Sequence, residues 1–326
     1  MGAPRIKVAI LGAGAYGTAL AQTLARAGRA TDILLIEHFL DVVDGINQGH
    51  ENPRFLPGVK LSPRIRAAGH ASAATGATVL LLTVPSGHAE AALKNASPDL
   101  DDGIPVVVGS KGFWGTPVRR GDLAAARAAP GHLIFALGGG ALAGELAAGQ
   151  ASTLVVGGPH PAAAAIADLL RGPGVKVEIT DDAAGVALGS AMKNIYALGL
   201  AVSESFCGGG DNWRAAYFCL ALAEMGRLCI ALGGRAETLY GPAGLGDLIA
   251  TGSSPRSRNR RLGLLLQAGK PLADAITELQ HRPEGLDALA WLRTQPAAEA
   301  RQAPLLHAIA AALDGDGGPV RACFAL

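Results

Sequence analysis

The fold is decided by the stretch Val8-Ala-Ile-Leu-Gly12-Ala-Gly14-Ala-Tyr16-Gly17-Thr-Ala-Leu-Ala21. Its G-x-G-x-x-G spacing follows an apolar, strand-like run and precedes an alanine-rich helical segment. In that setting the first glycine permits a tight turn, the second lets the backbone approach a pyrophosphate, and the third lets helix and strand pack closely. The start of the helix also offers unpaired N–H groups to phosphates. We therefore interpret the motif as a dinucleotide-binding loop in preference to an ordinary glycine turn.

Outward from this motif, short aliphatic runs alternate with alanine-rich helical stretches up to about residue 180. The expected strands are Lys7–Leu11, Ile33–Ile36, Thr78–Val84, Pro105–Val108, Leu133–Leu137 and Leu154–Val156. This alternation predicts βαβ units and a parallel sheet buried on both faces. Beyond residue 180 the expected helices are Ala183–Leu200, Trp213–Leu232 and Arg260–Ala268. The predicted fold is α/β, with a Rossmann-type, doubly wound, mainly parallel sheet in residues 1–180 and an all-α domain in residues 181–326.

Composition limits the class of protein. The chain has 326 residues, 49% of them hydrophobic, and a formal net charge of +1. It is too apolar to be disordered, and its balanced charge gives no reason to expect nucleic acid as a partner. The apolar run at the N-terminus breaks at Gly12 and no run of 18 apolar residues occurs, so neither a signal peptide nor a membrane span is expected. The four cysteines lack C-x-x-C spacing, so we expect no metal site, no disulfide framework and a cytoplasmic location.

The residue that ends the second expected strand indicates which dinucleotide binds. Glu37 follows Ile33–Ile36 and stands twenty positions after Gly17. A carboxylate there can accept hydrogen bonds from the adenosine ribose, and it repels a 2′-phosphate. No Arg or Lys follows in the sequence until Arg54. We therefore expect NAD as the cofactor rather than NADP. The alternative interpretation of Glu37 is a solvated acid at the end of a strand.

Two lysines stand where a catalytic cation is expected. Lys111 follows the strand Pro105–Val108, and ligands of open α/β sheets bind beyond the carboxyl ends of strands. Lys193 lies in the nearly uncharged segment Ala183–Leu200, beside Asn194. Burial lowers the pKa of a lysine, which can then exchange a proton with a carbonyl or an alcohol near neutral pH. The alternatives are a solvated loop lysine at position 111 and, at position 193, a lysine whose ammonium reaches the surface.

A second glycine cluster and a run of arginines follow in the helical half. Gly244-Leu-Gly-Asp247 ends in a carboxylate, and Ser257-Arg-Asn-Arg-Arg261 comes directly after Arg256. Guanidinium groups bind phosphate through paired hydrogen bonds, and a helix start adds free N–H groups. The segment therefore predicts a phosphate site, with a solvated basic helix end or a nucleic-acid patch as alternatives. Together with the dinucleotide loop and Lys193, it indicates hydride transfer to or from a small phosphorylated alcohol or ketone.

From Ile6 to about Pro319 the sequence closely resembles the bacterial-type NAD(P)-dependent sn-glycerol-3-phosphate dehydrogenases. The resemblance is carried by the segments Gly12–Ala21, Asn52–Gly58, Val84–Ser86, Ser110–Gly112, Met192–Asn194, Gly244–Leu248 and Ser257–Gly263. The last two segments, at their separation from Lys193, are highly specific to this family. The glycine motif alone is not.

The resemblance implies an activity and a set of site residues. The reaction is the interconversion of dihydroxyacetone phosphate and sn-glycerol 3-phosphate, which serves phospholipid synthesis, and the family suggests a homodimer. Lys193 is then the acid/base, with Lys111 and Asp247 as further catalytic residues. The implied substrate-binding residues are Lys111, Gly139, Lys193, Asp247, Ser257, Arg258 and Asn259. The implied cofactor-binding residues are Gly12, Gly14, Ala15, Tyr16, Gly17, Glu37, Phe55, Lys111, Ala143, Arg258 and Glu284.

The chain departs from the family at one predicted loop. The family reads Gly-Pro-Ser-Phe-Ala-x-Glu where this chain has Gly139-Gly-Ala-Leu-Ala-Gly-Glu145. Gly140 replaces the proline, and Ala141 lacks the serine hydroxyl that would meet substrate, a hydrogen bond that contributes about 0.5–1.5 kcal/mol. The basic residue common after the second strand is also absent. Two other functions therefore stay open: a dehydrogenase of another small phosphorylated hydroxy compound, and a non-enzymatic NAD-binding sensor.

Overall fold

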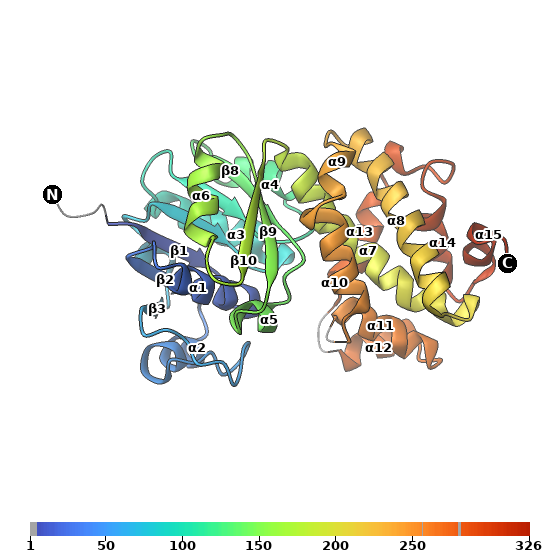
Figure 1. Cartoon of the computed structure of the whole chain (residues 1–326), viewed down its shortest axis with the longest axis horizontal. Helices are drawn as coiled ribbons and strands as arrows, with labels where there is room; N and C mark the ends of the chain where they lie inside the picture. The colour runs from blue at the N-terminus through green and yellow to red at the C-terminus, as the bar shows by residue number, and fades with distance from the viewer. Residues whose placement is uncertain (1–4, 256, 280–281) are drawn as a thin grey trace. The chain divides into compact units, whose positions relative to one another are not determined.

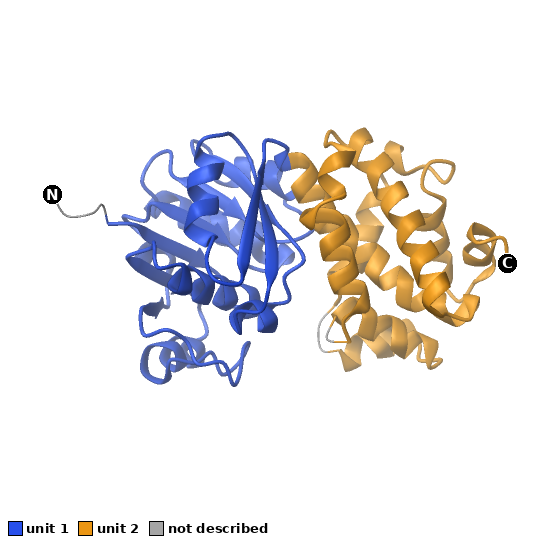
Figure 2. Ribbon diagram, viewed as in Figure 1, with its two compact units in different colours: residues 1–183 blue, residues 184–326 orange. Residues whose placement is uncertain are grey.

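The computed structural model describes residues 5–255, 257–279 and 282–326 (Figure 1). The chain divides into two compact units, Met1–Ala183 and Ala184–Leu326 (Figure 2). Among the described residues, every strand belongs to the first unit, and the second unit contains helices. This division confirms the predicted class, an α/β part followed by an all-α part.

Unit 1 is built on one sheet of eight strands with the order β10-β9-β8-β5-β4-β1-β2-β3. These strands are β1 (Lys7–Leu11), β2 (Asp32–Ile36), β3 (Ile65–Ala68), β4 (Val79–Leu82), β5 (Pro105–Val108), β8 (Leu133–Gly138), β9 (Ser152–Gly157) and β10 (Val175–Thr180). All neighbours pair in parallel except β8 and β9. From β1 the chain adds β2 and then β3 on one side. It then crosses back and adds β4 and β5 on the other side of β1. The switch point, where ligands of open sheets bind, therefore lies at the carboxyl ends of β1 and β4.

Helices cover both faces of this sheet. They are α1 (Ala15–Ala27), α2 (Leu40–Asp44), α3 (Ser86–Ala96), α4 (Gly121–Ala128), α5 (Ala143–Ala147) and α6 (Ala162–Leu170), and β6 (Phe113–Trp114) pairs with β7 (Arg119–Arg120) in a separate two-stranded sheet. Val8 and Ile10 of β1 pack into one core with α1 and α6. Ala9 and Leu11 pack into the other with α3 and α4. Burial on both faces explains why the interior strands are apolar throughout.

The sequence prediction missed the two edge strands, β3 and β10. Each has a neighbour on one side only and carries polar side chains among apolar ones. In β3 the exposed side chain of Arg66 stands between two buried residues, Ile65 and Ala67. A short strand with one exposed face lacks the continuous apolar run by which the interior strands were recognised.

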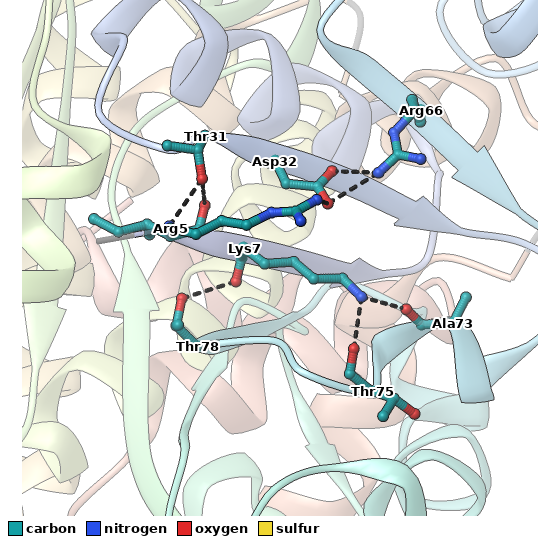
Figure 3. A network of polar contacts seen from close by, with 9 residues as sticks. Arg5, Lys7, Thr31, Asp32, Arg66, Ala73, Thr75 and Thr78 are labelled. Carbon is teal, nitrogen blue, oxygen red and sulfur yellow. Dashed lines mark hydrogen bonds and ion pairs between the residues drawn. The ribbon is translucent and has the colours of Figure 1, made fainter. Parts of the chain in front are cut away.

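The amino ends of β1 and β2 carry a network of polar contacts (Figure 3). Asp32, which is 7% exposed, accepts hydrogen bonds from Arg66 at 2.7 and 2.9 Å. The ammonium of Lys7 donates to the backbone carbonyls of Ala73 and Thr75 at 2.8 and 2.7 Å. Charged groups at this end of the sheet therefore hold β2 to β3, and β1 to the segment that contains Ala73 and Thr75. The opposite, carboxyl end carries the glycine motif.

Unit 2 is an array of helices around the long helix α7 (Ala183–Cys207). The others are α8 (Asp211–Ala231), α9 (Ala236–Leu239), α10 (Asp247–Ser253), α11 (Arg258–Gln267), α12 (Leu272–Glu278), α13 (Glu284–Leu292), α14 (Pro304–Leu313) and α15 (Gly318–Cys323). Helix α7 is long and apolar enough to cross a membrane, but 94% of its most apolar 18-residue window is buried inside the protein. Its Gly189 leaves room for the backbone of Ala243, whose oxygen a Cβ at position 189 would approach to 2.6 Å. Helix α7 is therefore the central core helix of unit 2.

Candidate active site

The three glycines of the motif differ in what surrounds them. Gly12 has φ +104°, and a Cβ there would lie 2.9 Å from the backbone nitrogen of Val84. A Cβ at Gly17 would lie 2.1 Å from the carbonyl oxygen of Gly12. At Gly14 nothing lies within 4 Å of the Cβ position. The first and third glycines are thus required by the fold itself, whereas the second borders open space.

The open space lies at the start of helix α1. Gly14 is the N-cap of this helix, and it provides no side-chain cap. The amides of the first helical turn, beginning at Ala15, therefore keep their usual capacity to bind an anion, assisted by the helix dipole. An uncapped helix start beside a residue without a side chain fits the pyrophosphate of a dinucleotide. The cofactor-binding interpretation of Gly12, Gly14 and Gly17 is consistent with this geometry.

The peptide group of Ala13, inside the motif, is held from two directions. Its N–H donates to Glu37 Oε2 at 3.1 Å, and its carbonyl oxygen accepts from Asn52 Nδ2 at 2.7 Å. The side chain of Asn52 is fully buried and also donates to Thr18 Oγ1 at 2.8 Å. Asn52 therefore fixes the glycine loop to the loop that follows α2. Sequence reasoning noted Asn52 as part of a family segment and gave it no role.

Glu37 is 8% exposed, so it is not a solvated acid. Besides the bond to Ala13, its Oε1 accepts from the backbone N–H of His38 at 2.9 Å and lies 2.8 Å from His38 Nδ1. The carboxylate stands at the end of β2, directly beside the glycine loop, as a ribose-binding acid must. Its predicted contact with the ribose stays a prediction.

The remaining expected residues of unit 1 lie on different elements. Lys111 is half-buried, and its Nζ lies 5.4 Å from the ring centroid of Tyr16, a cation–π geometry that brings both residues to the start of α1. Phe55 is half-buried, and its N–H donates to Asn52 Oδ1 at 3.0 Å. Ala143 is the first residue of α5.

Gly139 is required by the backbone. It has φ +128°, and a Cβ there would lie 2.4 Å from the carbonyl oxygen of Thr153. The divergent Ala141 is buried, and its N–H donates to the carbonyl of Gly139 at 2.9 Å. A tight turn therefore replaces the proline-containing loop expected from the family.

In unit 2, Lys193 is buried with a matching acid. The lysine is 5% exposed and Asp247 is 3% exposed, and Lys193 Nζ lies 2.8 Å from Asp247 Oδ1. Lys193 therefore does not extend to the surface. The same Nζ donates to Thr251 Oγ1 at 2.6 Å, and Thr251 donates to Asp247 Oδ1 at 3.2 Å. These three side chains, which we call the lysine triad, combine a buried ammonium, a buried carboxylate and a hydroxyl that is hydrogen-bonded to both.

Thr251 was missed by sequence reasoning although a signal existed. It follows Asp247 by four residues, and both lie in helix α10. Residues four apart lie on the same face of a helix. The glycine cluster before Asp247, Pro242–Gly246, is itself helical, and Gly244 packs against the backbone of Leu239, whose oxygen lies 2.3 Å from the Cβ position. This contact fixes the point at which α10 begins.

A second group of polar side chains joins α7, α11 and α13. Asn259 Nδ2 donates to Asn194 Oδ1 at 3.0 Å, and Asn259 Oδ1 accepts from the N–H of Gly285 at 3.3 Å. Asn194 Nδ2 lies 3.4 Å from Glu284 Oε2. Because Asn194 is adjacent to Lys193 on α7, this group is coupled to the lysine triad through one helix. It brings the expected residues Asn259 and Glu284 together.

The arginine run divides into different roles. Ser257 is the N-cap of α11, and its Oγ accepts from the backbone N–H of Arg260 at 3.3 Å. Arg258 is exposed, with its Nη2 4.0 Å from Glu284 Oε1. Arg260 instead binds the carbonyl of Gly252 at 3.1 Å and lies 3.5 Å from Glu204 Oε2.

The expectation that all four arginines form one phosphate receptor is therefore wrong for Arg260, because a buried carboxylate already binds its guanidinium. Arg261 is exposed on α11, and Arg256 lies outside the described residues. The guanidinium of Arg258, at the start of α11, is exposed, and its nearest recorded charged partner is Glu284.

Tyr196 stands one turn after Lys193, so its hydroxyl has to be considered as a second proton donor. Burial, together with the nearby carboxylate of Glu224, raises the pKa of Tyr196 well above its usual value. Its OH donates to Glu224 Oε1 at 2.8 Å. The proton of the Tyr196 hydroxyl is therefore already engaged by a buried carboxylate inside unit 2. Within the part of the chain that the structure describes, no three His, Cys, Asp or Glu side chains are grouped to hold a metal ion.

Comparisons with known proteins agree with this geometry. The family models for the N-terminus and the C-terminus of NAD-dependent glycerol-3-phosphate dehydrogenase match residues 7–164 and 182–323. A glycerol-3-phosphate dehydrogenase [NAD(P)+] of Caulobacter vibrioides is 37% identical over 95% of this chain and 93% of its own length. The enzyme of that name from Thermobifida fusca is 38% identical over 98% and 96%.

Solved structures show the same fold. The crystal structure of glycerol-3-phosphate dehydrogenase from Coxiella burnetii superimposes with a TM-score of 0.87 at 32% identity and covers 98% of both chains. A glycerol-3-phosphate dehydrogenase from Saccharomyces cerevisiae, at 23% identity, gives a TM-score of 0.84, which supports the fold alone. The family resemblance inferred from the sequence is confirmed.

Proposed function

The chain belongs to the NAD-dependent glycerol-3-phosphate dehydrogenase family, and from this premise we propose that it interconverts dihydroxyacetone phosphate and sn-glycerol 3-phosphate. The observation that carries the proposal is the lysine triad, in which a buried ammonium lies 2.8 Å from a buried carboxylate. Such a pair costs desolvation energy, and its cost is offset only where geometry and further hydrogen bonds are good. Reduction of a carbonyl needs a proton donor of this kind.

The residues divide the chemical work as follows. When bound, the dinucleotide would supply the hydride for the C2 carbonyl carbon of the substrate, whose oxygen then needs a proton. Lys193 Nζ gives a proton to that oxygen, and Asp247 balances the charge of the lysine before transfer. Thr251 Oγ1, at 2.6 Å from the ammonium, fixes its direction. In the oxidation direction Lys193 takes the proton from the alcohol. Lys111 is proposed as a second cation beside the substrate oxygen.

The substrate phosphate is assigned to Arg258 at the start of α11, with Asn259 and Ser257 holding that start in place. The guanidinium is exposed, whereas the two neighbours are buried and hydrogen-bonded within the unit. Binding energy from the phosphate can then orient the reacting carbon. The cofactor assigned on Glu37 is NAD(H). The family resemblance supports the remaining parts of the proposal, namely a cytoplasmic homodimer whose product serves phospholipid synthesis.

The test is oxidation of NADH, followed at its absorbance band, with dihydroxyacetone phosphate at millimolar concentration. Turnover is expected, and its absence with purified, folded protein would overturn the proposal. A panel of other small phosphorylated ketones tests the second candidate, which the buried Ala141 favours because it lacks the hydroxyl of the family loop. Tight NADH binding without turnover on any ketone would indicate the non-enzymatic sensor.

A further inference from the structure

Glu204 is a buried carboxylate of α7 that the proposed reaction does not use. It is 8% exposed and stands eleven residues after Lys193, which places it about three turns farther along the same side of the helix. Its two oxygens bind separate guanidinium groups. Oε1 accepts from Arg214 Nε at 2.6 Å, and Oε2 lies 3.5 Å from Arg260 Nη2. Because a buried charge needs a partner, this carboxylate holds both arginines to α7.

The two arginines lie on different helices and differ in exposure. The side chain of Arg214, on α8, is 41% exposed, and its Nη1 also lies 3.1 Å from Asp211 Oδ1. The side chain of Arg260, on α11, is 16% exposed, and its Nη1 donates to the carbonyl of Gly252, near the end of α10, at 3.1 Å. Arg260 therefore connects three helices: α11, on which it lies, α10 through Gly252, and α7 through Glu204.

The three helices that Arg260 connects carry the candidate site residues of unit 2. Lys193 lies on α7, Asp247 and Thr251 lie on α10, and α11 begins with Arg258. One ion pair therefore bears on the relative placement of the lysine triad and the residue assigned to the substrate phosphate.

Close packing brings α10 and α11 to the same stretch of α7. A Cβ at Gly263 of α11 would lie 2.3 Å from Ala201 Cβ, and a Cβ at Gly252 of α10 would lie 3.2 Å from Leu200 Cδ2. Glu204 follows these two residues of α7 by one helical turn. Its carboxylate thus lies beside the place where the three helices meet.

The start of α11 depends on this ion pair more than α10 does. The lysine triad also holds α10 to α7. The start of α11 is held to α7 by Asn259, through a bond between neutral amides at 3.0 Å, and by Arg260, through its charge. Hydrogen bonds between charged groups are about twice as strong as neutral ones. Ser257, the N-cap, accepts from the N–H of Arg260, so the cap itself is bonded to the residue that Glu204 holds.

We infer that Glu204 is a positioning residue of the substrate phosphate site, a role that rests on the proposed function of Arg258. Through Arg260 it fixes the start of α11, from which the guanidinium of Arg258 reaches the phosphate. It also keeps Arg260 itself from the phosphate, because that guanidinium is bound to the carboxylate. Paired hydrogen bonds to phosphate depend on direction, so a small displacement of Arg258 weakens them.

The experiment compares the wild type with Glu204→Gln, Glu204→Asp and Arg214→Met. Glutamine keeps the size and removes the charge, aspartate keeps the charge on a shorter side chain, and Arg214→Met removes the other guanidinium from the same carboxylate. We expect kcat/KM for dihydroxyacetone phosphate to fall about 10- to 100-fold in Glu204→Gln, less in Glu204→Asp, and less than about 3-fold in Arg214→Met. Glu237→Gln, at an exposed carboxylate of α9, is the matched control and leaves the value unchanged.

A substrate without a phosphate distinguishes positioning from a general loss of structure. Dihydroxyacetone carries the same carbonyl group and no phosphate, so its kcat/KM should change less than about 3-fold in Glu204→Gln. The KM for NADH should stay unchanged as well. Equal losses with both ketones would mean that Glu204 supports unit 2 as a whole, and they would overturn the inference. An unchanged or higher kcat/KM for dihydroxyacetone phosphate in Glu204→Gln would overturn it too.

A second readout needs no substrate. Hydrogen exchange of the backbone amides of residues 258–261, followed by mass spectrometry, reports how firmly the start of α11 is held. These amides should exchange faster in Glu204→Gln than in the wild type, and at the wild-type rate in Glu237→Gln. If they do so and the wild type turns over no ketone, the proposed reaction fails and the role of Glu204 in holding α11 stands. If their exchange is unchanged in Glu204→Gln, the inference fails whatever the activity.

Discussion

Lys193 and Asp247 form an ion pair at 2.8 Å in which the side chains are only 7% and 4% exposed. The charge of each is balanced by the other, so removal of either leaves an unpaired charge in the core of unit 2. Removing one member of a buried ion pair is strongly destabilising, because the other charge stays buried without a partner. Replacing both members by well-packed apolar residues often leaves the stability of a protein nearly unchanged. The pair therefore links the activity of the site to the stability of the fold, and tests of the site have to separate the two.

Lys193→Ala is expected to lower kcat by about 10²- to 10⁴-fold, the usual contribution of a positioned proton donor. The variant also leaves a cavity and an unpaired Asp247, so folding is checked by circular dichroism. Small primary amines added to the folded variant should fill the cavity and restore part of the turnover. Lys94→Ala, at a largely exposed lysine of α3, is the control and keeps normal turnover. Near-normal kcat in Lys193→Ala would contradict the acid/base role.

Thr251→Val removes the hydroxyl and keeps the shape of the side chain. The hydroxyl donates to Asp247 Oδ1 at 3.2 Å and accepts from Lys193 at 2.6 Å, so the variant leaves the ammonium one partner short. A hydrogen bond to a charged group contributes about 1.5–3 kcal/mol, and we expect kcat to fall about 10- to 100-fold. Thr251→Ser retains the hydroxyl and should recover most of the loss. Equal kcat in the valine and serine variants would show that the hydroxyl does not orient Lys193.

The interior of the sheet can be predicted from the sequence because its strands are buried on both faces. β1 and β5 occupy the residues expected, Lys7–Leu11 and Pro105–Val108. β10 could not be recognised in the same way: Lys176 and Glu178 point outward and form an ion pair with each other at 2.7 Å. Alternation over six residues is a weaker signal than an unbroken apolar run.

The residues of the candidate site likewise differ in how far they can be predicted from the sequence. Residues that stand in a motif, such as Gly14 or Lys193, can be found because their chemistry is visible in a local stretch. Thr251 can be found only once the start of α10 is known. Asn52 lies in a family segment, but its hydrogen bond to Ala13, 39 residues away in the sequence, is visible only in the folded chain.

Gly14→Ala and Gly17→Ala separate the cofactor site from the fold. A Cβ at position 14 meets no protein atom within 4 Å, whereas at position 17 it would lie 2.1 Å from the Gly12 carbonyl. Gly14→Ala should therefore fold normally and bind NADH about 10-fold more weakly or worse, because the methyl group enters the pyrophosphate space. Gly17→Ala should lose about 2 kcal/mol or more of unfolding free energy. NADH fluorescence titration and thermal denaturation measure the two effects. Normal NADH affinity in Gly14→Ala would contradict the pyrophosphate assignment.

Glu224 provides a pH test of the core that supports Lys193. It is 1% exposed and accepts hydrogen bonds from Tyr196 and from the N–H groups of Leu305 and Leu306 at 2.7–2.8 Å. Burial raises the pKa of Glu224, although these hydrogen bonds oppose the effect. The folded state therefore favours the protonated acid, and its contribution to stability is complete at pH values below the unfolded pKa and is lost as pH rises through the folded pKa.

Because glutamine does not titrate, Glu224→Gln removes this dependence. The free energy of unfolding of the wild type minus that of the variant should fall as pH is raised from 4 to 8. Urea denaturation is followed by tryptophan fluorescence in a Trp114→Phe background, so that the signal comes from Trp213 and Trp291, both in unit 2. A difference that rises with pH would mean that the hydrogen bonds outweigh burial and that the pKa of Glu224 is lowered. Tyr196 joins Glu224 to α7, the helix that carries Lys193. In that case a rise in pH would stabilise unit 2 around Lys193, whereas a raised pKa of Glu224 means that a rise in pH destabilises it.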